Sequence, residues 1–93
     1  ITAAEAYRIG LVNEVYPAEE LLDKALEMAN TIASKGPLAI RMAKECINRG
    51  LDMPLSNALD FEKVNFGAVC GSFDSTEGCA AFLEKRKAEF KGK

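Results

Sequence analysis

The sequence contains no histidine and no tryptophan among its 93 residues. The absence of histidine excludes Ser-His and Cys-His nucleophile pairs, His-bearing zinc sites and imidazole proton relays. Any proton transfer would therefore fall to carboxylates, lysines or tyrosines. No apolar run approaches the ~20 residues of a membrane span, so we expect no membrane partner.

Cysteine is scarce, and Cys46, Cys70 and Cys79 are widely spaced without a CxxC pair. An odd number of cysteines without a fourth ligand predicts neither a disulfide framework nor a metal site. We interpret them as reduced thiols that act as small apolar side chains, with reactive or redox cysteine as the alternative. Reduced cysteines favour a cytosol-like compartment, and we predict a cytoplasmic location.

A long basic run is also missing, since 12 Lys and Arg stand against 14 Asp and Glu for a net charge of -2. We therefore expect no nucleic-acid partner, because such binding depends on a concentrated positive surface. The length allows one domain, residues 1–93, which would bury only about 60 to 65% of its unfolded surface. A core of that size gives marginal stability, so we expect contacts between subunits.

The chain opens with a helix-start signal. Thr2 and Glu5 form the S/T-x-x-E capping box, which predicts a short helix over Ala3–Ile9. The box accounts for Glu5 without a catalytic role, although a general base is the alternative. Gly10 is suited to the left-handed turn that stops the helix, and Leu11–Tyr16 alternates like a brief extended segment.

The remaining apolar residues recur every three or four positions, which is typical of amphipathic helices. The pattern predicts four helices: Glu19–Ser34, Pro37–Arg49, one that opens at Pro54, and Ser75–Lys87. Ser72 to Asp74 supply caps for the last of these, and we expect the tail from Phe90 to be frayed. The fold class is therefore all-α: a small helical domain of about five helices with one short extended link.

The helix that opens at Pro54 is apolar on two sides. Two sets of residues follow the helical period, Leu55, Ala58, Leu59, Phe66 and Val69 on one side and Phe61, Val64 and Ala68 on another. Such a helix packs both on its own domain and on something else, such as a neighbouring subunit. For Glu62, which lies within the first set, we expect a structural hydrogen bond or an interface ion pair rather than catalysis.

Three stretches carry a more specific pattern: ITAAEAYRIGLVNEV from Ile1, GPLAIRMAKECINRGLDMPL from Gly36, and EGCAAFLEKRKAEFKG from Glu77. Together they closely resemble the C-terminal part of enoyl-CoA hydratases of the crotonase superfamily. The resemblance covers essentially the whole chain in the family's order and is specific to the superfamily. It is less specific to one reaction, because isomerases, dehydratases and hydrolases of the superfamily share this helical end.

The resemblance implies that residues 1–93 are the C-terminal trimerisation domain of a longer enzyme, which fits a start at Ile1 rather than methionine. An N-terminal β/α spiral domain would carry two catalytic glutamates and two oxyanion-hole amides. In the family these groups hydrate trans-2-enoyl-CoA, or dehydrate 3-hydroxyacyl-CoA, in fatty-acid metabolism. Coenzyme A is then part of the substrate, and no separate cofactor is implied.

It follows from the resemblance that the chain holds no catalytic residue and no metal ligand and is inactive by itself. The parent enzyme is expected to be a homo-oligomer, a trimer or a dimer of trimers, with an acyl-CoA thioester as its substrate. Two other functions stay open. One is an enoyl-CoA isomerase of the same superfamily, and the other is a non-catalytic helical module that assembles subunits and binds no nucleotide.

Phe82 and Lys85 are the candidate CoA-binding residues. On a helix, residues three apart are neighbours, so an aromatic ring would lie beside an ammonium and suit adenine stacking and a ribose phosphate. In the family, the matching residues of the A-F-x-E-K-R ending help to hold the adenosine part of CoA, often in a neighbouring subunit's site. Core packing of Phe82 and a solvated Lys85 are the alternative, and Arg86 and Lys87 are secondary candidates.

Overall fold

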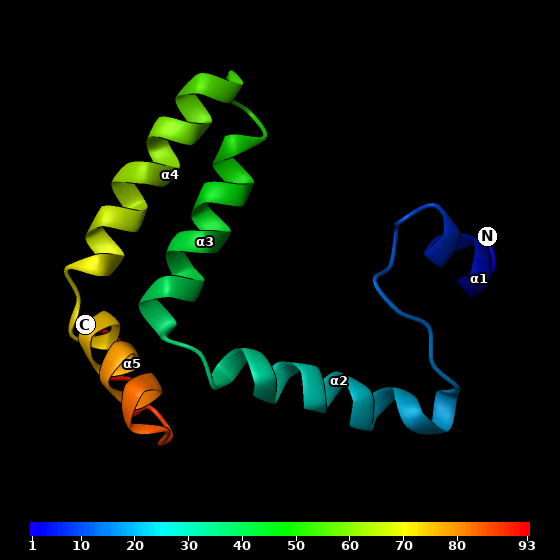
Figure 1. The fold of residues 1–93 in the computed structure, drawn as a ribbon. Coiled ribbons are helices and arrows are strands. Elements are labelled where there is room, and N and C mark those ends of the chain that lie inside the picture. The colour runs from blue at the N-terminus through cyan, green and yellow to red at the C-terminus, as the bar shows by residue number, and fades with distance from the viewer. The chain divides into compact units, whose positions relative to one another are not determined.

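Five α-helices make up the regular secondary structure of the chain, and a computed structural model describes residues 1–93 (Figure 1). The helices are α1 (Ala3–Arg8), α2 (Ala18–Ala33), α3 (Pro37–Gly50), α4 (Leu55–Cys70) and α5 (Phe73–Glu84). The predicted all-α class and number of helices are confirmed. The chain divides into two units, Ile1–Ile32 and Ala33–Lys93.

The first helix begins at the predicted cap but forms only half of the capping box. The Thr2 hydroxyl accepts a hydrogen bond from the Glu5 N–H at 3.2 Å. The Glu5 carboxylate turns the other way and accepts two bonds from the Arg8 guanidinium, at 2.7 and 2.6 Å. A bidentate, charge-assisted pair outcompetes a single backbone amide for the carboxylate. Gly10 follows with a φ of +75°, as the left-handed stop requires.

The expected extended segment Leu11–Tyr16 contains no strand. The N–H groups of Leu11 and Val12 donate to the carbonyl of Ala6, at 2.8 and 3.4 Å, which folds the chain back on α1 as a turn. A β-strand needs a partner strand for its backbone groups, and no other residue of the chain is in a strand. Leu11–Tyr16 is therefore an irregular link and not a strand.

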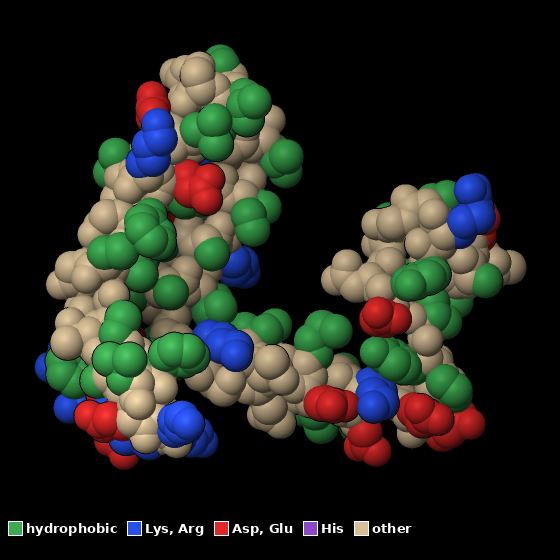
Figure 2. All heavy atoms as spheres, in the orientation of Figure 1, with side chains coloured by type: hydrophobic (Ala, Val, Ile, Leu, Met, Phe, Trp, Pro, Cys, Tyr) green, Lys and Arg blue, Asp and Glu red, His purple; other side chains and the backbone are tan.

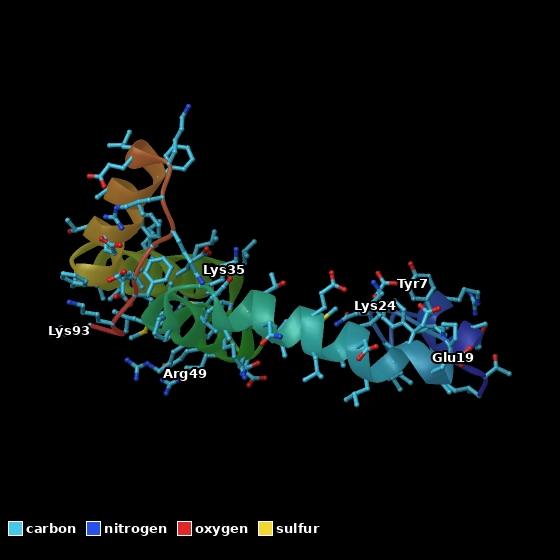
Figure 3. The ribbon with its side chains drawn as sticks, turned by 90° about the horizontal axis from the view of Figure 1, so that it is seen from below. Tyr7, Glu19, Lys24, Lys35, Arg49 and Lys93 are labelled. Atoms are coloured by element: carbon cyan, nitrogen blue, oxygen red, sulfur yellow. The ribbon has the colours of Figure 1, made fainter.

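Helix α2 carries apolar residues at helical spacing, as predicted, but none of its residues is buried. Leu22 is 68% exposed and Leu21 55%. Figure 3 shows the side chains of α2 projecting around the whole helix, with Glu19 and Lys24 toward its first half. The amphipathic pattern formed the helix without giving it a partner within its own unit.

In the second unit, α3 and α4 pack side by side as an antiparallel helical hairpin (Figure 1). Pro37 occupies the first turn of α3, where its missing N–H has no helical partner. A tight turn joins the helices, with the Asp52 N–H donating to the Arg49 carbonyl at 3.1 Å. Helix α5 packs against α4 and is capped by Ser72, whose hydroxyl accepts from the Ser75 N–H at 3.1 Å.

The C-terminal tail is anchored, which corrects the prediction that it is frayed. The carboxylate of Asp74, only 5% exposed, accepts hydrogen bonds from the N–H groups of Lys91 and Gly92 at 2.6 and 2.8 Å. The Asp74 N–H in turn donates to the Lys93 carbonyl at 3.1 Å. The half-buried Phe90 packs by Gly78, where an added Cβ would lie 3.4 Å from its ring. From the sequence we assigned Asp74 only a capping role, and the local pattern did not predict these long-range hydrogen bonds.

The buried core is very small. Only Ala6 and Ala81 are buried apolar residues, while Leu55 and Phe66 of α4 are 74% and 68% exposed. Figure 2 shows hydrophobic side chains gathered on the visible face of the α3–α4 hairpin. The helices therefore present far more apolar surface than the chain itself covers.

Candidate functional site

Phe82 lies on the last turn of α5 and is 83% exposed. Within these 93 residues Phe82 therefore does not pack in a core. Its ring borders a hollow of about 360 Å³ that is also lined by Cys79 and Phe90. An exposed ring at the rim of a hollow offers a flat apolar surface to another planar group.

Lys85 lies beyond the end of α5, not on it. The predicted helix to Lys87 is wrong, because Lys85 adopts the left-handed conformation at φ 54° and ψ 38° and ends the helix. Two backbone bonds close this end: the Lys85 N–H donates to the Phe82 carbonyl at 3.3 Å, and the Arg86 N–H to the Ala81 carbonyl at 3.0 Å. This is the pattern of a Schellman C-cap. Phe82 and Lys85 are thus linked by a backbone hydrogen bond of the helix cap, and they are not side-chain neighbours on one face of a helix.

Arg86 is committed to carboxylates and is not a free cation. Its guanidinium donates to both oxygens of Glu77, at 2.6 and 2.9 Å, and through Nε to Glu84 at 2.6 Å. The Glu77 side chain is only 12% exposed and also accepts the Glu89 N–H at 2.8 Å. Lys85 makes no hydrogen bond or ion pair with its side chain, so its ammonium stays open to a ligand.

The Glu77–Arg86 pair has shifted proton affinities. The Arg86 guanidinium lowers the pKa of the Glu77 carboxyl from 4.5 to about 2, and the Glu89 N–H adds to the effect. The same pair raises the pKa of Arg86 above its usual range, with Glu84 as the second cause. Hydrogen bonds to the charged form stabilise it, so both groups stay ionised across the physiological range.

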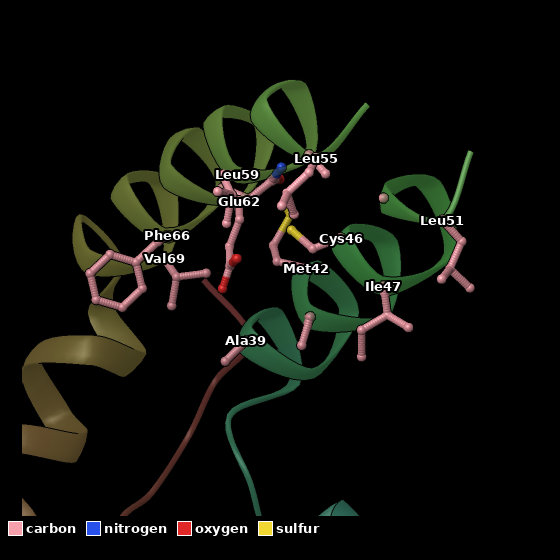
Figure 4. A pocket seen from close by; sticks show the side chains of 14 residues that line it. Ala39, Met42, Cys46, Ile47, Leu51, Leu55, Leu59, Glu62, Phe66 and Val69 are labelled. Atoms are coloured by element: carbon pink, nitrogen blue, oxygen red, sulfur yellow. The ribbon is translucent and has the colours of Figure 1, made fainter. Parts of the chain in front are cut away.

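A second concavity, the α3–α4 groove, has a volume of about 630 Å³ and is mostly apolar. Leu59 and Val69 of α4 face Met42 and Cys46 of α3 across it (Figure 4). Glu62 points into this groove from α4 (Figure 4). The groove suits apolar contacts rather than chemistry, because Glu62 is its one acidic side chain.

Glu62 makes no hydrogen bond or ion pair within the chain, and it is exposed. The expected bond to this carboxylate is therefore absent from the chain itself. No group of three or more His, Cys, Asp or Glu side chains lies close enough together to hold a metal ion. No helix combines the length and the apolar character needed to cross a membrane.

The residues that sequence reasoning missed are Glu77 and Asp74 as tail anchors. Their partners lie nine to eighteen residues away, beyond the reversal at Lys85. Helical spacing relates residues three or four apart and is silent about such distances. The one local signal for these contacts was the presence of an acidic residue in α5, Glu77, and of an arginine just after the helix, Arg86.

The whole chain, residues 1–93, matches the family described as enoyl-CoA hydratase/isomerase. A crotonyl-CoA hydratase of Syntrophomonas wolfei is 47% identical over 90 residues, which span 97% of this chain and 35% of the relative. A short-chain-enoyl-CoA hydratase of Clostridium acetobutylicum is 45% identical over 89 residues, 96% of this chain and 34% of the relative. The chain thus spans about a third of the length of these relatives.

The crystal structure of an enoyl-CoA hydratase from Bacillus anthracis superposes with a TM-score of 0.97 at 44% identity. The match covers 100% of this chain and 36% of that one. An enoyl-CoA hydratase/isomerase from Mycobacterium abscessus gives a TM-score of 0.94 at 46% identity, with 39% of its chain covered. The helical fold is therefore the fold of the corresponding part of these enzymes.

The lowered pKa of Glu77 gives a prediction for acid pH. Because folding lowers this pKa from 4.5 to about 2, the pair stabilises the tail fully above about pH 4.5 and is lost as the pH falls through about 2. We expect a carboxyl ¹³C NMR titration of the chain to give a Glu77 midpoint near 2. Arg86→Ala should move the midpoint toward 4.5. Arg49→Ala, which removes the arginine paired with Glu45 on α3, should not; a midpoint near 4.5 in the unsubstituted chain would contradict the pairing.

Proposed function

Because the chain belongs to the enoyl-CoA hydratase/isomerase family, we propose that it is the C-terminal helical part of a hydratase-type lyase that acts on acyl-CoA thioesters. The reaction would be hydration of a trans-2-enoyl-CoA and the reverse dehydration of a 3-hydroxyacyl-CoA. The 93 residues would supply contacts between subunits and part of the CoA pocket. The acid–base groups and the oxyanion hole would come from the rest of the enzyme.

The observation that carries this proposal is the match along all 93 residues to a hydratase family and to relatives named for enoyl-CoA hydration. The side chains of this chain agree with a binding role. Seven of its 14 acids pair with a basic group or anchor the tail, and Glu62 is the one acid that lines the apolar groove. We therefore assign the chain no step in the chemistry.

For CoA binding, the useful groups are the exposed ring of Phe82 and the unpaired ammonium of Lys85. The ring would stack on adenine, and the ammonium would meet a phosphate of the same ligand. Arg86 would not compete, because two carboxylates already neutralise it. Coenzyme A is the carrier of the substrate here, and no separate cofactor is proposed.

We further propose that the enzyme serves fatty-acid metabolism, is cytoplasmic, and is a homo-oligomer built on trimers. The exposed apolar surface of α4 supports the oligomer, since uncovered patches of this kind mark contacts with other chains. An enoyl-CoA isomerase is the second candidate, because the family's description names both activities. Assays of the enzyme that carries this chain with 2-enoyl and 3-enoyl thioesters separate the two.

The proposal is tested with a hybrid hydratase. In it, residues 1–93 replace the matching third of the Syntrophomonas wolfei crotonyl-CoA hydratase, which is 47% identical in that region. We expect the hybrid to hydrate crotonyl-CoA, measured as loss of the absorbance of the conjugated thioester. The isolated chain, and the relative without its matching third, should show no turnover above buffer.

Three outcomes would contradict the proposal. A hybrid that fails to fold, judged by circular dichroism and sedimentation against the parent hydratase, would mean that the chain is not equivalent to the third it replaces. A hybrid that folds and assembles but gives no turnover would mean that it does not supply what the active site requires. Turnover by the purified 93 residues alone would overturn the absence of catalytic groups.

Lys85→Ala in the hybrid tests the CoA contact. Loss of an exposed ion pair to a phosphate should raise KM for crotonyl-CoA by about 2- to 30-fold, or about 0.5 to 2 kcal/mol. The effect should shrink as salt rises and leave kcat nearly unchanged, because the contact is remote from the reacting carbons. Lys44→Ala, which removes an exposed lysine of α3, is the control. An unchanged KM at low salt would show that Lys85 is only a solvated cation.

Val64→Lys tests the subunit contact. Val64 is 73% exposed on α4, on the side away from the groove lining. A buried ammonium without a partner is costly, so the substitution should shift the chain toward monomer in sedimentation velocity. Ser56→Lys, which adds the same charge at a polar position of α4, should leave the assembly unchanged. A chain that is monomeric at high concentration with or without the substitution would reject this face as an interface.

A further inference from the structure

Lys85 is held in a conformation that its side chain disfavours. It is the one residue other than glycine with a positive φ, at 54°. Helices commonly end on such a residue, but glycine usually occupies it, because a Cβ crowds the backbone there. A lysine at this position adopts an unfavourable backbone conformation, and its ammonium group is attached directly at the chain reversal. Strain of this kind is a reason to look for a function and for the groups that hold it.

The groups that hold the reversal come from Glu77. Its two oxygens grip the Arg86 guanidinium at 2.6 and 2.9 Å, and one of them also accepts the Glu89 N–H at 2.8 Å. Arg86 is the residue directly after Lys85, and its own N–H caps the Ala81 carbonyl at 3.0 Å. The backbone on the far side of Lys85 is thus fixed both by a cap and by a bidentate ion pair.

The same arrangement gives the acid next to Lys85 in the sequence a different partner. Glu84 precedes Lys85 in the chain, and its carboxylate is taken by the Nε of Arg86 at 2.6 Å. Glu84 is the acid nearest to Lys85 in the sequence. Without Arg86, its carboxylate would be free to pair with the lysine ammonium. An ammonium paired with its own chain binds an external phosphate less well, because one interaction must be given up for the other.

We propose that Glu77 is a positioning residue for the CoA site: by holding Arg86 it fixes Lys85 beside Phe82 and leaves the ammonium free for a phosphate of the ligand. This inference rests on the proposed function, since it assumes that Lys85 meets CoA. Glu77 itself touches no ligand. Its role is distinct from that of Asp74, which anchors the last three residues of the tail and does not contact Arg86.

The test is a double-mutant cycle in the hybrid hydratase. Glu77→Gln keeps the shape of the side chain but removes the charge that grips Arg86. We expect it to raise KM for crotonyl-CoA by about 2- to 10-fold at low salt with kcat unchanged, within the range expected for Lys85→Ala. In the Lys85→Ala background, Glu77→Gln should raise KM no further, because the two act through one contact. Glu45→Gln, which breaks the Arg49–Glu45 pair at 2.8 Å on α3, is the matched control and should leave KM unchanged.

The outcomes separate this inference from the proposed function. If Lys85→Ala raises KM but Glu77→Gln does not, or if their effects on KM multiply, the positioning role is wrong and the CoA contact stands. If neither substitution changes KM, the CoA contact itself is wrong.

A second pair of variants guards against a folding effect. Arg86→Lys keeps the charge but loses the two-pronged grip, and should give an intermediate KM with little change in the melting temperature. Lys85→Gly suits the left-handed position, so it should keep or raise the melting temperature while KM rises as in Lys85→Ala. A KM increase that follows the loss of melting temperature across all variants would show a purely structural role and overturn the inference.

Discussion

The apolar faces of the helices are mostly exposed, because the chain itself buries only a small part of them. The rest of the structure depends on this limited burial of apolar surface. Ala6 and Ala81 are the only buried apolar residues, and both are small. Burial of apolar surface is the main favourable term in folding, so a chain that buries so little is only marginally stable unless another surface covers it. The open α3–α4 groove and the exposed side of α4 are the visible result.

Where little apolar surface is buried, hydrogen bonds and ion pairs hold the chain in place. In the second unit the tail is held by the carboxylates of Asp74 and Glu77 and by a contact of the Lys91 ammonium with the Phe73 ring, 4.8 Å from its centre. These bonds satisfy backbone N–H groups that a frayed tail would leave to water. They also bring the tail back along α5, from the reversal at Lys85 to Asp74 in the first turn of the helix. The candidate CoA-binding end is therefore built on ion pairs more than on packing.

Much of the helical framework could be predicted from local patterns. Thr2, Pro37 and Ser72 mark helix starts by rules that involve only a few neighbouring residues, and Gly10 follows the end of α1 with a positive φ. Helix α5, however, begins at Phe73, two residues before the predicted start at Ser75. The failures are equally instructive. Leu11–Tyr16 had the right alternation for a strand, but strand formation depends on a distant partner that the chain does not provide.

The sequence by itself determined the number of helices, the start of most of them and the family, because each rests on spacing within about one turn or on a contiguous motif. Only the tertiary structure decided that α5 stops at Glu84, that Lys85 turns left-handed, and that Arg86 is taken by Glu77. The physical reason is range. From local pattern alone, the basic run Lys85–Lys87 predicts a continuation of the helix. The ion pair of Arg86 across the chain reversal depends instead on the position of Glu77, nine residues away in the sequence. Periodicity contains no information about that distance.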